Sequence, residues 1–226
     1  MKTILLYLLI ISFFIIIPLA GNHAVATFSE MQTAPNCVVL DAGHGGVDSG
    51  AVSCTGVYES QINLEITRKL NDLMHLLGVH TIMIREDDRS VYSEGTTIAA
   101  KKVSDIRNRV KTVNNVPKAL LISIHQNNFP QEKYSGAQVF YNTNPGSKEL
   151  ANEMQTAFRE YLNPFNKRQT KKSSGVYLME HINCTGILIE CGFLSNPREE
   201  ALLRDSEYQK KISAVIATTV SQYLNT

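Results

Sequence analysis

Three short apolar runs in this chain each end on a residue that can bind a metal ion or carry a proton. Residues 37–44 end on His44, residues 119–125 end on His125, and residues 186–190 end on Glu190. Runs of this kind are typical of buried strands, and in open α/β sheets ligands bind beyond the carboxyl ends of the strands. The sequence therefore predicts that two imidazoles and a carboxylate face one crevice.

The segment that follows the first run predicts an amphipathic helix. Its apolar residues recur at steps of four and three residues, which places them on one helix face. They are Ile62, Ile66, Leu70, Leu73 and Leu77. Gly78 comes next and is a typical helix stop. We expect a helix over residues 59–77 that packs on a sheet.

The rest of the chain continues this alternation. We expect further strands at 81–84, 137–141 and 176–179, and further helices at 101–115, 147–162 and 208–224. Strands that alternate with helices predict an α/β fold with a largely parallel sheet and helices on both faces.

The N-terminal residues predict export. Residues 4–20 are almost wholly apolar, follow a single Lys2, and lead to the small residues 24–26. This pattern fits a signal peptide, while retention as a membrane anchor is the alternative. We expect residues 1–26 to be this leader, 27–35 a tether, and 36–226 one catalytic domain, because a chain of 226 residues with 43% apolar content suits one substantial domain.

Charge and cysteine content narrow the partners. Without its leader the chain has 21 basic and 21 acidic residues, so no global field favours nucleic acid. The membrane is expected as a partner only through the leader. A local basic stretch, with Lys167 and Arg168 followed by Lys171 and Lys172, is either a solvated loop or a contact for an anionic polymer of the cell envelope. The four cysteines are expected to be free thiols, although an exported chain also permits two disulfides.

The residues at the run ends suggest a metal site. Glycines surround His44, and they allow a tight turn that aims its ring into the crevice. A phosphate-binding loop is disfavoured because G-x-G-x-x-G and the P-loop lysine are missing. Glu59 at a helix start and His125 at a strand end each have an ordinary structural explanation. Together with His44, however, they form a known ligand set for catalytic zinc, with the fourth position open for water.

Glu190 is the predicted catalytic residue. A carboxylate at the end of an apolar strand is costly to bury without a partner or a function. A structural ion pair is the alternative. Beside an activated water, Glu190 would act as a general base and then protonate a departing amine. This chemistry is that of a hydrolase.

Four motifs in order resemble those of the zinc-dependent N-acetylmuramoyl-L-alanine amidases of bacterial cell walls. They are DAGHGGVDSGA around His44, Glu59 with Asn63 and Leu64, SIHQN around His125, and LIECGFLSNP around Glu190. The resemblance runs from about residue 38 to residue 224. It implies a single-domain, mixed and mostly parallel sheet of about six strands, similar to the phosphorylase/hydrolase-like fold.

The resemblance also implies the chemistry. His44, Glu59 and His125 match residues that bind one Zn²⁺, and Glu190 matches the catalytic glutamate. The implied reaction is hydrolysis of the amide between the lactyl group of N-acetylmuramic acid and L-alanine, with peptidoglycan as the partner. Asn127, the last residue of the SIHQN motif, is a predicted substrate-binding residue.

A narrower resemblance is to the spore-cortex, CwlD-type amidases. It rests on residues 94–97 and the helix after them, on 134–141, and on 174–179. It implies removal of stem peptides for muramic-δ-lactam formation, at the cell envelope or in the spore intermembrane space. The need for an accessory protein is open. The alternatives are a vegetative autolysin, a zinc carboxypeptidase acting on stem peptides, and a non-catalytic wall-binding regulator.

Overall fold

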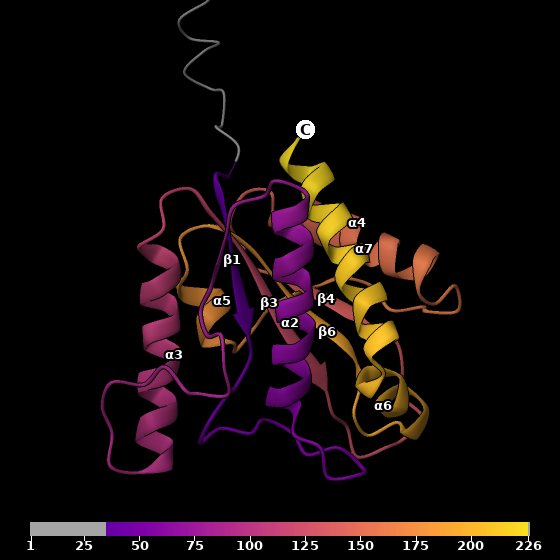
Figure 1. The fold of residues 1–226 in the computed structure, drawn as a ribbon, viewed down its shortest axis with the longest axis horizontal. Coiled ribbons are helices and arrows are strands. Elements are labelled where there is room, and N and C mark those ends of the chain that lie inside the picture. Colours follow the sequence, from indigo (N-terminus) through magenta and orange to yellow (C-terminus); the bar gives the residue numbers. More distant parts are fainter. Residues whose placement is uncertain (1–34, 226) are drawn as a thin grey trace, which may run out of the picture. The chain divides into compact units, whose positions relative to one another are not determined.

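The computed structural model describes residues 35–225, which form a six-stranded mixed sheet with helices on both faces (Figure 1). The strand order is β2-β1-β3-β6-β4-β5, and only the pairing of β4 with β6 is antiparallel. The predicted fold class is therefore confirmed. The strands are β1 (Cys37–Ala42), β2 (Thr81–Met83), β3 (Ala119–Asn127), β4 (Gln138–Tyr141), β5 (Lys171–Lys172) and β6 (Thr185–Phe193).

The helices separate into two layers. In Figure 1, α2 and α7 lie side by side over one face of the sheet, where α4 also packs, while α3 and α5 pack together on the opposite face. Their bounds are α2 (Glu59–Leu76), α3 (Ile98–Asn114), α4 (Ser147–Tyr161), α5 (Tyr177–His181), α6 (Pro197–Arg204) and α7 (Ser206–Leu224).

The central strands are apolar because both of their faces are covered. In β1, Val38 and Leu40 join the core under α2 and α7, while Val39 between them joins the core under α3 and α5. All three side chains are fully buried. Side chains alternate across a strand, so a strand buried on both faces has no polar alternation.

The three apolar runs become neighbouring strands. β1, β3 and β6 are adjacent, parallel and central in the sheet. Parallel strands bring their carboxyl ends to the same edge, so residues that are far apart in the sequence meet there. This adjacency positions the candidate site.

Helix α2 follows the predicted stripe except at its end. Ile62, Ile66 and Leu70 are buried as expected, but Leu77 is 51% exposed and Met74 takes its place in the core. The helix ends at Leu76, and Gly78 adopts a φ of 74°, a backbone conformation that residues other than glycine rarely adopt. The apolar stripe therefore stops one turn earlier than predicted.

Three elements differ from the predictions. Residues 176–179 were predicted as a strand, but residues 177–179 form the start of helix α5. Leu178 and Ile182 are one helical turn apart, and both enter the core beneath α3. Helix α6 was not predicted; it follows β6 after a short loop. The two-residue edge strand β5 also lacks a sequence signal, because both of its residues are exposed lysines.

Several predictions about the N-terminus are not tested. The predicted leader and the tether up to residue 34 lie outside the described residues. Among residues 35–225, no helix has the length and apolar character needed to cross a bilayer. The four cysteines, all within this range, are free thiols as expected.

Candidate metal centre

His44 lies on a tight turn directly after β1. Its φ of 61° is in the left-handed region, where a residue with a side chain is strained by about 1 kcal/mol. Such strain persists where surrounding contacts impose it and is common at functional sites. Its Nδ1 lies 2.8 Å from Asp48 Oδ2, so the Nδ1–H donates to that carboxylate and leaves Nε2 free for another partner.

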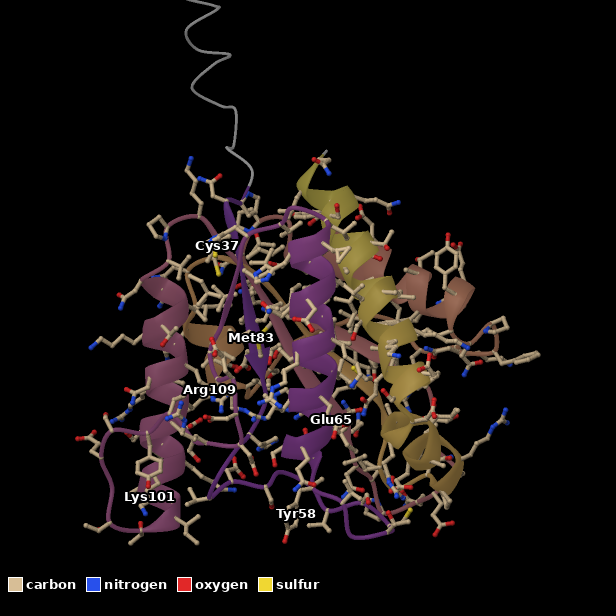
Figure 2. All side chains as sticks on the ribbon, viewed as in Figure 1. Cys37, Tyr58, Glu65, Met83, Lys101 and Arg109 are labelled. Atoms are coloured by element: carbon tan, nitrogen blue, oxygen red, sulfur yellow. The ribbon has the colours of Figure 1, made fainter. Side chains whose placement is uncertain are left out.

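Glu59 is the first residue of α2, directly after Tyr58, which is labelled at the lower edge of Figure 2. Its carboxylate is buried and accepts hydrogen bonds from the backbone N–H groups of Ala51 and Gln126, at 2.9 and 3.1 Å. Burial disfavours its charge, but hydrogen bonds to His125 and His44 outweigh this and lower the pKa of Glu59 well below its usual range. It is therefore a fixed negative charge.

The carboxylate of Glu59 lies between the two histidine rings. Glu59 Oε2 is 3.3 Å from His44 Nε2, and Oε1 is 3.0 Å from His125 Nδ1. The two rings meet edge to face, with centroids 5.0 Å apart. One donor atom from each of the three residues lies within 4.8 Å of the other two. The three residues predicted as ligands thus meet, although they come from a turn, a helix start and a strand.

The chemistry of these donors fits a zinc ion. Two imidazoles and one carboxylate leave a fourth position open, as in catalytic zinc sites. Asp48 holds the distal nitrogen of His44, and Lys102 Nζ lies 2.6 Å from Asp48 Oδ1. Such an outer carboxylate fixes the tautomer of a metal-binding histidine. Burial lowers the pKa of His44, but hydrogen bonds to Asp48 and Glu59 outweigh this effect and raise the pKa to about 9. The two carboxylates therefore favour a positive charge at the His44 ring.

Glu190 faces this cluster from the next strand. It is the register partner of His125 in the pairing of β3 with β6. Part of the residue is exposed, but its Oε2 is buried and has no hydrogen-bond partner within residues 35–225. Burial raises the pKa of Glu190 to about 7, with smaller effects from the charges of His125, Glu59 and His44. In the described part of the chain, this carboxyl group forms no ion pair.

This burial predicts a pH effect on the stability of the metal-free protein. The folded carboxyl group keeps its proton up to about pH 7, whereas the unfolded chain releases it near pH 4.5. Raising the pH through this window therefore lowers the free energy of unfolding, by about 2 kcal/mol. Urea unfolding at pH 5 and pH 8 should show this loss, and the Glu190→Gln variant should lack it. Equal pH slopes for both proteins would contradict the burial of an ionisable carboxyl group here.

Asn127, the predicted substrate-binding residue, lies two positions beyond His125. A register shift separates the two in the pairing with β6, and the backbone oxygen of Asn127 accepts from Leu194 N–H at 2.8 Å. Strand β3 therefore continues past His125, where the sequence predicted its end. The role of the Asn127 side chain stays a prediction.

Two buried arginines, which the sequence reasoning missed, hold the turn that carries His44. Arg109 donates from Nη1 to Ala42 O at 2.9 Å and from Nη2 to His44 O at 2.7 Å. Arg85 donates from Nε to the same Ala42 O at 2.8 Å and from Nη2 to Gly43 O at 3.1 Å. Figure 2 labels Arg109 between α3 and β1. The carbonyl groups of residues 42–44 are thus fixed from two sides.

Arg109 also neutralises a carboxylate within β1. Arg109 Nη1 donates to Asp41 Oδ1, and Ser123 Oγ donates to Asp41 Oδ2 at 2.6 Å. Burial opposes the ionisation of Asp41, but the Arg109 charge outweighs it and lowers the pKa of Asp41. A signal for both residues existed in the sequence: Asp41 interrupts an apolar strand, and Arg109 falls on the same helix face as Ile106 and Val113.

Fold and site together define an α/β protein with the groups of a metal-dependent hydrolase: three side chains that could hold a metal ion, facing a largely buried carboxyl group. The sequence model described as N-acetylmuramoyl-L-alanine amidase matches residues 38–222. The chain belongs to the N-acetylmuramoyl-L-alanine amidase family. The predicted family and the predicted amidase activity are confirmed by this membership.

Individual relatives agree with the family. The germination-specific N-acetylmuramoyl-L-alanine amidase of Bacillus subtilis is 39% identical over 188 residues, which are 82% of this chain and 78% of that protein. The CwlD amidase of Clostridioides difficile, solved in complex with the GerS lipoprotein, is 40% identical with a TM-score of 0.81 over 84% of this chain and 98% of that one. The catalytic domain of CwlV from Bacillus (Paenibacillus) polymyxa is 28% identical with a TM-score of 0.70, over 84% and 98%.

Proposed function

We propose that this protein is an exported, zinc-dependent amidase that removes stem peptides from spore-cortex peptidoglycan. The observation that carries the proposal is the convergence of His44, Glu59 and His125 beside the unpartnered carboxyl group of Glu190. The similarity to a germination-specific amidase favours the cortex over a vegetative autolysin. The place of action would be the cell envelope or the spore intermembrane space.

The proposed mechanism assigns each residue a task. His44 Nε2, the Glu59 carboxylate and a His125 ring nitrogen would hold zinc, which when bound supplies a Lewis acid that polarises the scissile carbonyl and activates water. Glu190 accepts the proton of the attacking water and then donates it to the departing amine of L-alanine. One carboxyl group can make both transfers, because it accepts a proton as the carboxylate and returns it as the acid.

An accessory lipoprotein is the proposed partner. The similar CwlD amidase of Clostridioides difficile was solved in complex with the GerS lipoprotein. We infer that a lipoprotein of this kind assists the present chain. Zinc occupancy of the purified protein, measured with and without a co-expressed candidate lipoprotein from the same organism, tests this inference, and equal occupancy and equal activity would count against it.

The reaction is tested by mass spectrometry of muropeptides incubated with the purified protein, with and without a zinc chelator. Release of intact stem peptides that begin with alanine, lost on chelation and restored by zinc, is the expected result. Release of a terminal alanine alone would instead indicate a carboxypeptidase. Binding to peptidoglycan without any cleavage would indicate a wall-binding regulator.

The approach of the His125 ring to Gly43 gives a further prediction. A Cβ atom added to Gly43 would lie 2.2 Å from both Cε1 and Nε2 of that ring. The Gly43→Ala variant must therefore displace His125, and we expect zinc affinity to fall by at least about tenfold, the usual scale for disturbed ligand orientation. Competitive zinc titration measures this.

The matched control is Gly192→Ala in β6. Its new methyl group would meet only flexible side-chain ends, the nearest being Leu203 at 3.2 Å. This variant should bind zinc as the wild type does. Unchanged zinc affinity in Gly43→Ala would show that the His125 ring does not serve as a ligand in this position.

A further inference from the structure

A groove of about 770 Å³ lies between the loop that follows α4, residues 133–136 and the start of α6. In Figure 1 this loop and α6 are on the same side of the molecule. The charged side chains that line it are Lys133, Lys167, Arg168, Arg198 and Glu199. The groove thus carries four positive charges and one negative charge, in a chain whose overall charge is nearly balanced.

The single acid of the groove already has partners. Glu199 Oε1 accepts from Gly136 N–H at 2.7 Å, and its Oε2 accepts from Phe193 N–H at 2.9 Å. Its carboxylate therefore serves the backbone of the two neighbouring segments. The four cations form no ion pair within 4 Å in the described part of the chain, so their charge is available to a ligand.

Arg168, which lines the groove, is held in a defined position by three contacts. Its Nε donates to Ser135 O at 2.8 Å, its Nη1 donates to Gln138 Oε1 at 2.9 Å, and its guanidinium lies 4.4 Å from the centre of the Phe193 ring. Within residues 35–225, the Nη2 of Arg168 makes no hydrogen bond. A planar guanidinium held in this way can donate from Nη2 to a carboxylate.

Arg168 is linked to the catalytic carboxyl group through one residue. Gln138, its hydrogen-bond partner, is paired with Glu190 in the antiparallel register of β4 and β6. Side chains of such a pair lie on the same face with Cβ atoms about 5 Å apart. An extended peptide advances about 3.3–3.6 Å per residue. A stem peptide whose scissile bond lies beside the Glu190 carboxyl group therefore needs only a few residues to reach Arg168.

We propose that this groove binds a carboxylate of the stem peptide, with Arg168 as the main contact and Lys133 and Lys167 as supporting charges. The proposal rests on the proposed amidase function. It gives the basic stretch around residue 168 a specific task. An anionic wall polymer is less suited, because the cations gather in one groove, which Gln138 connects to Glu190, rather than along an extended band.

The test compares two double variants of the zinc-loaded protein. Lys133→Gln with Lys167→Gln removes two exposed charges of the groove, and Lys171→Gln with Lys172→Gln removes two exposed charges of β5 that do not line it. The substrate is a soluble muramoyl peptide with free carboxylates, and its carboxamide form serves for comparison. For the free acid, the groove variant should raise KM about three- to tenfold with kcat unchanged, and the β5 variant should match the wild type.

Arg168→Gln provides the second measurement. Loss of a charge-assisted contact should lower kcat/KM for the free acid about 10- to 100-fold and leave the carboxamide substrate much less affected. Its melting temperature, compared with that of the wild type, shows whether the loop remains folded. If the loop does not fold, the lysine variants and the comparison of the two substrates in the wild type still decide the proposal.

The outcomes separate this proposal from the function on which it rests. A wild-type protein that cleaves neither substrate contradicts the proposed function itself. A wild-type protein that cleaves both forms with equal kcat/KM, or a groove variant with an unchanged KM, overturns the carboxylate site and leaves the amidase intact. If the groove variant binds a glycerol phosphate polymer more weakly than the wild type does but has an unchanged KM for the muramoyl peptide, the groove is assigned to that polymer. This result would also overturn the proposal.

Discussion

Glu190→Gln is expected to lower kcat of the zinc-loaded protein by about 10³-fold while leaving zinc affinity and the fold unchanged. The amide has nearly the same size as the carboxyl group but cannot accept the proton of water or return one to the amine. Because Glu190 Oε2 has no hydrogen-bond partner in the described residues, the substitution breaks no structural contact. Single-turnover kinetics on muropeptides, together with zinc analysis, measures both quantities.

The contrast with His125→Ala makes this result specific. That variant removes one of the three proposed zinc ligands, so we expect zinc and activity to be lost together. Glu160→Gln on the exposed surface of α4 is the matched control and should behave as the wild type. Normal hydrolysis by the Glu190→Gln protein would refute the proposed role of the carboxyl group, and full zinc binding by His125→Ala would refute the proposed ligand set.

Arg109→Met is expected to lower the free energy of unfolding by about 3–5 kcal/mol. Methionine keeps most of the volume but leaves the carboxylate of Asp41 buried without its counter-ion. It also removes the Arg109 hydrogen bond to His44 O and leaves Ala42 O with Arg85 as its remaining arginine donor. Arg109 and Asp41 are 2% and 1% exposed, so water cannot replace these contacts without a change of structure. Urea denaturation measures the loss.

Two further variants identify its cause. Arg107→Met removes an exposed arginine from the same helix and should change stability by less than about 0.5 kcal/mol. Adding Asp41→Asn to Arg109→Met should restore part of the loss, because the uncompensated charge is then removed. A loss of less than 1 kcal/mol in Arg109→Met would show that the buried ion pair does not support the His44 turn.

The residues of the candidate site could be predicted because they are polar or ionisable residues within apolar segments. His44, His125 and Glu190 each stand at the end of an apolar run, where a polar group is costly to bury. Asp41 satisfies the same criterion but was not singled out. Arg109 and Asp48 could not be assigned a task, because their partners Asp41 and His44 come from other elements or from the far side of a turn.

The sequence alone determined which segments are buried strands and which residue types stand at their ends, since apolar periodicity and the cost of burying charge act locally. It also determined the family, through motifs carried by those residues. Only the tertiary structure decided that β1, β3 and β6 are neighbours and that residues 177–179 become helical. It also decided that Arg168 is hydrogen-bonded to Gln138, the cross-strand neighbour of Glu190. These outcomes depend on strand order and long-range packing, in which each segment's neighbours lie far away in the sequence.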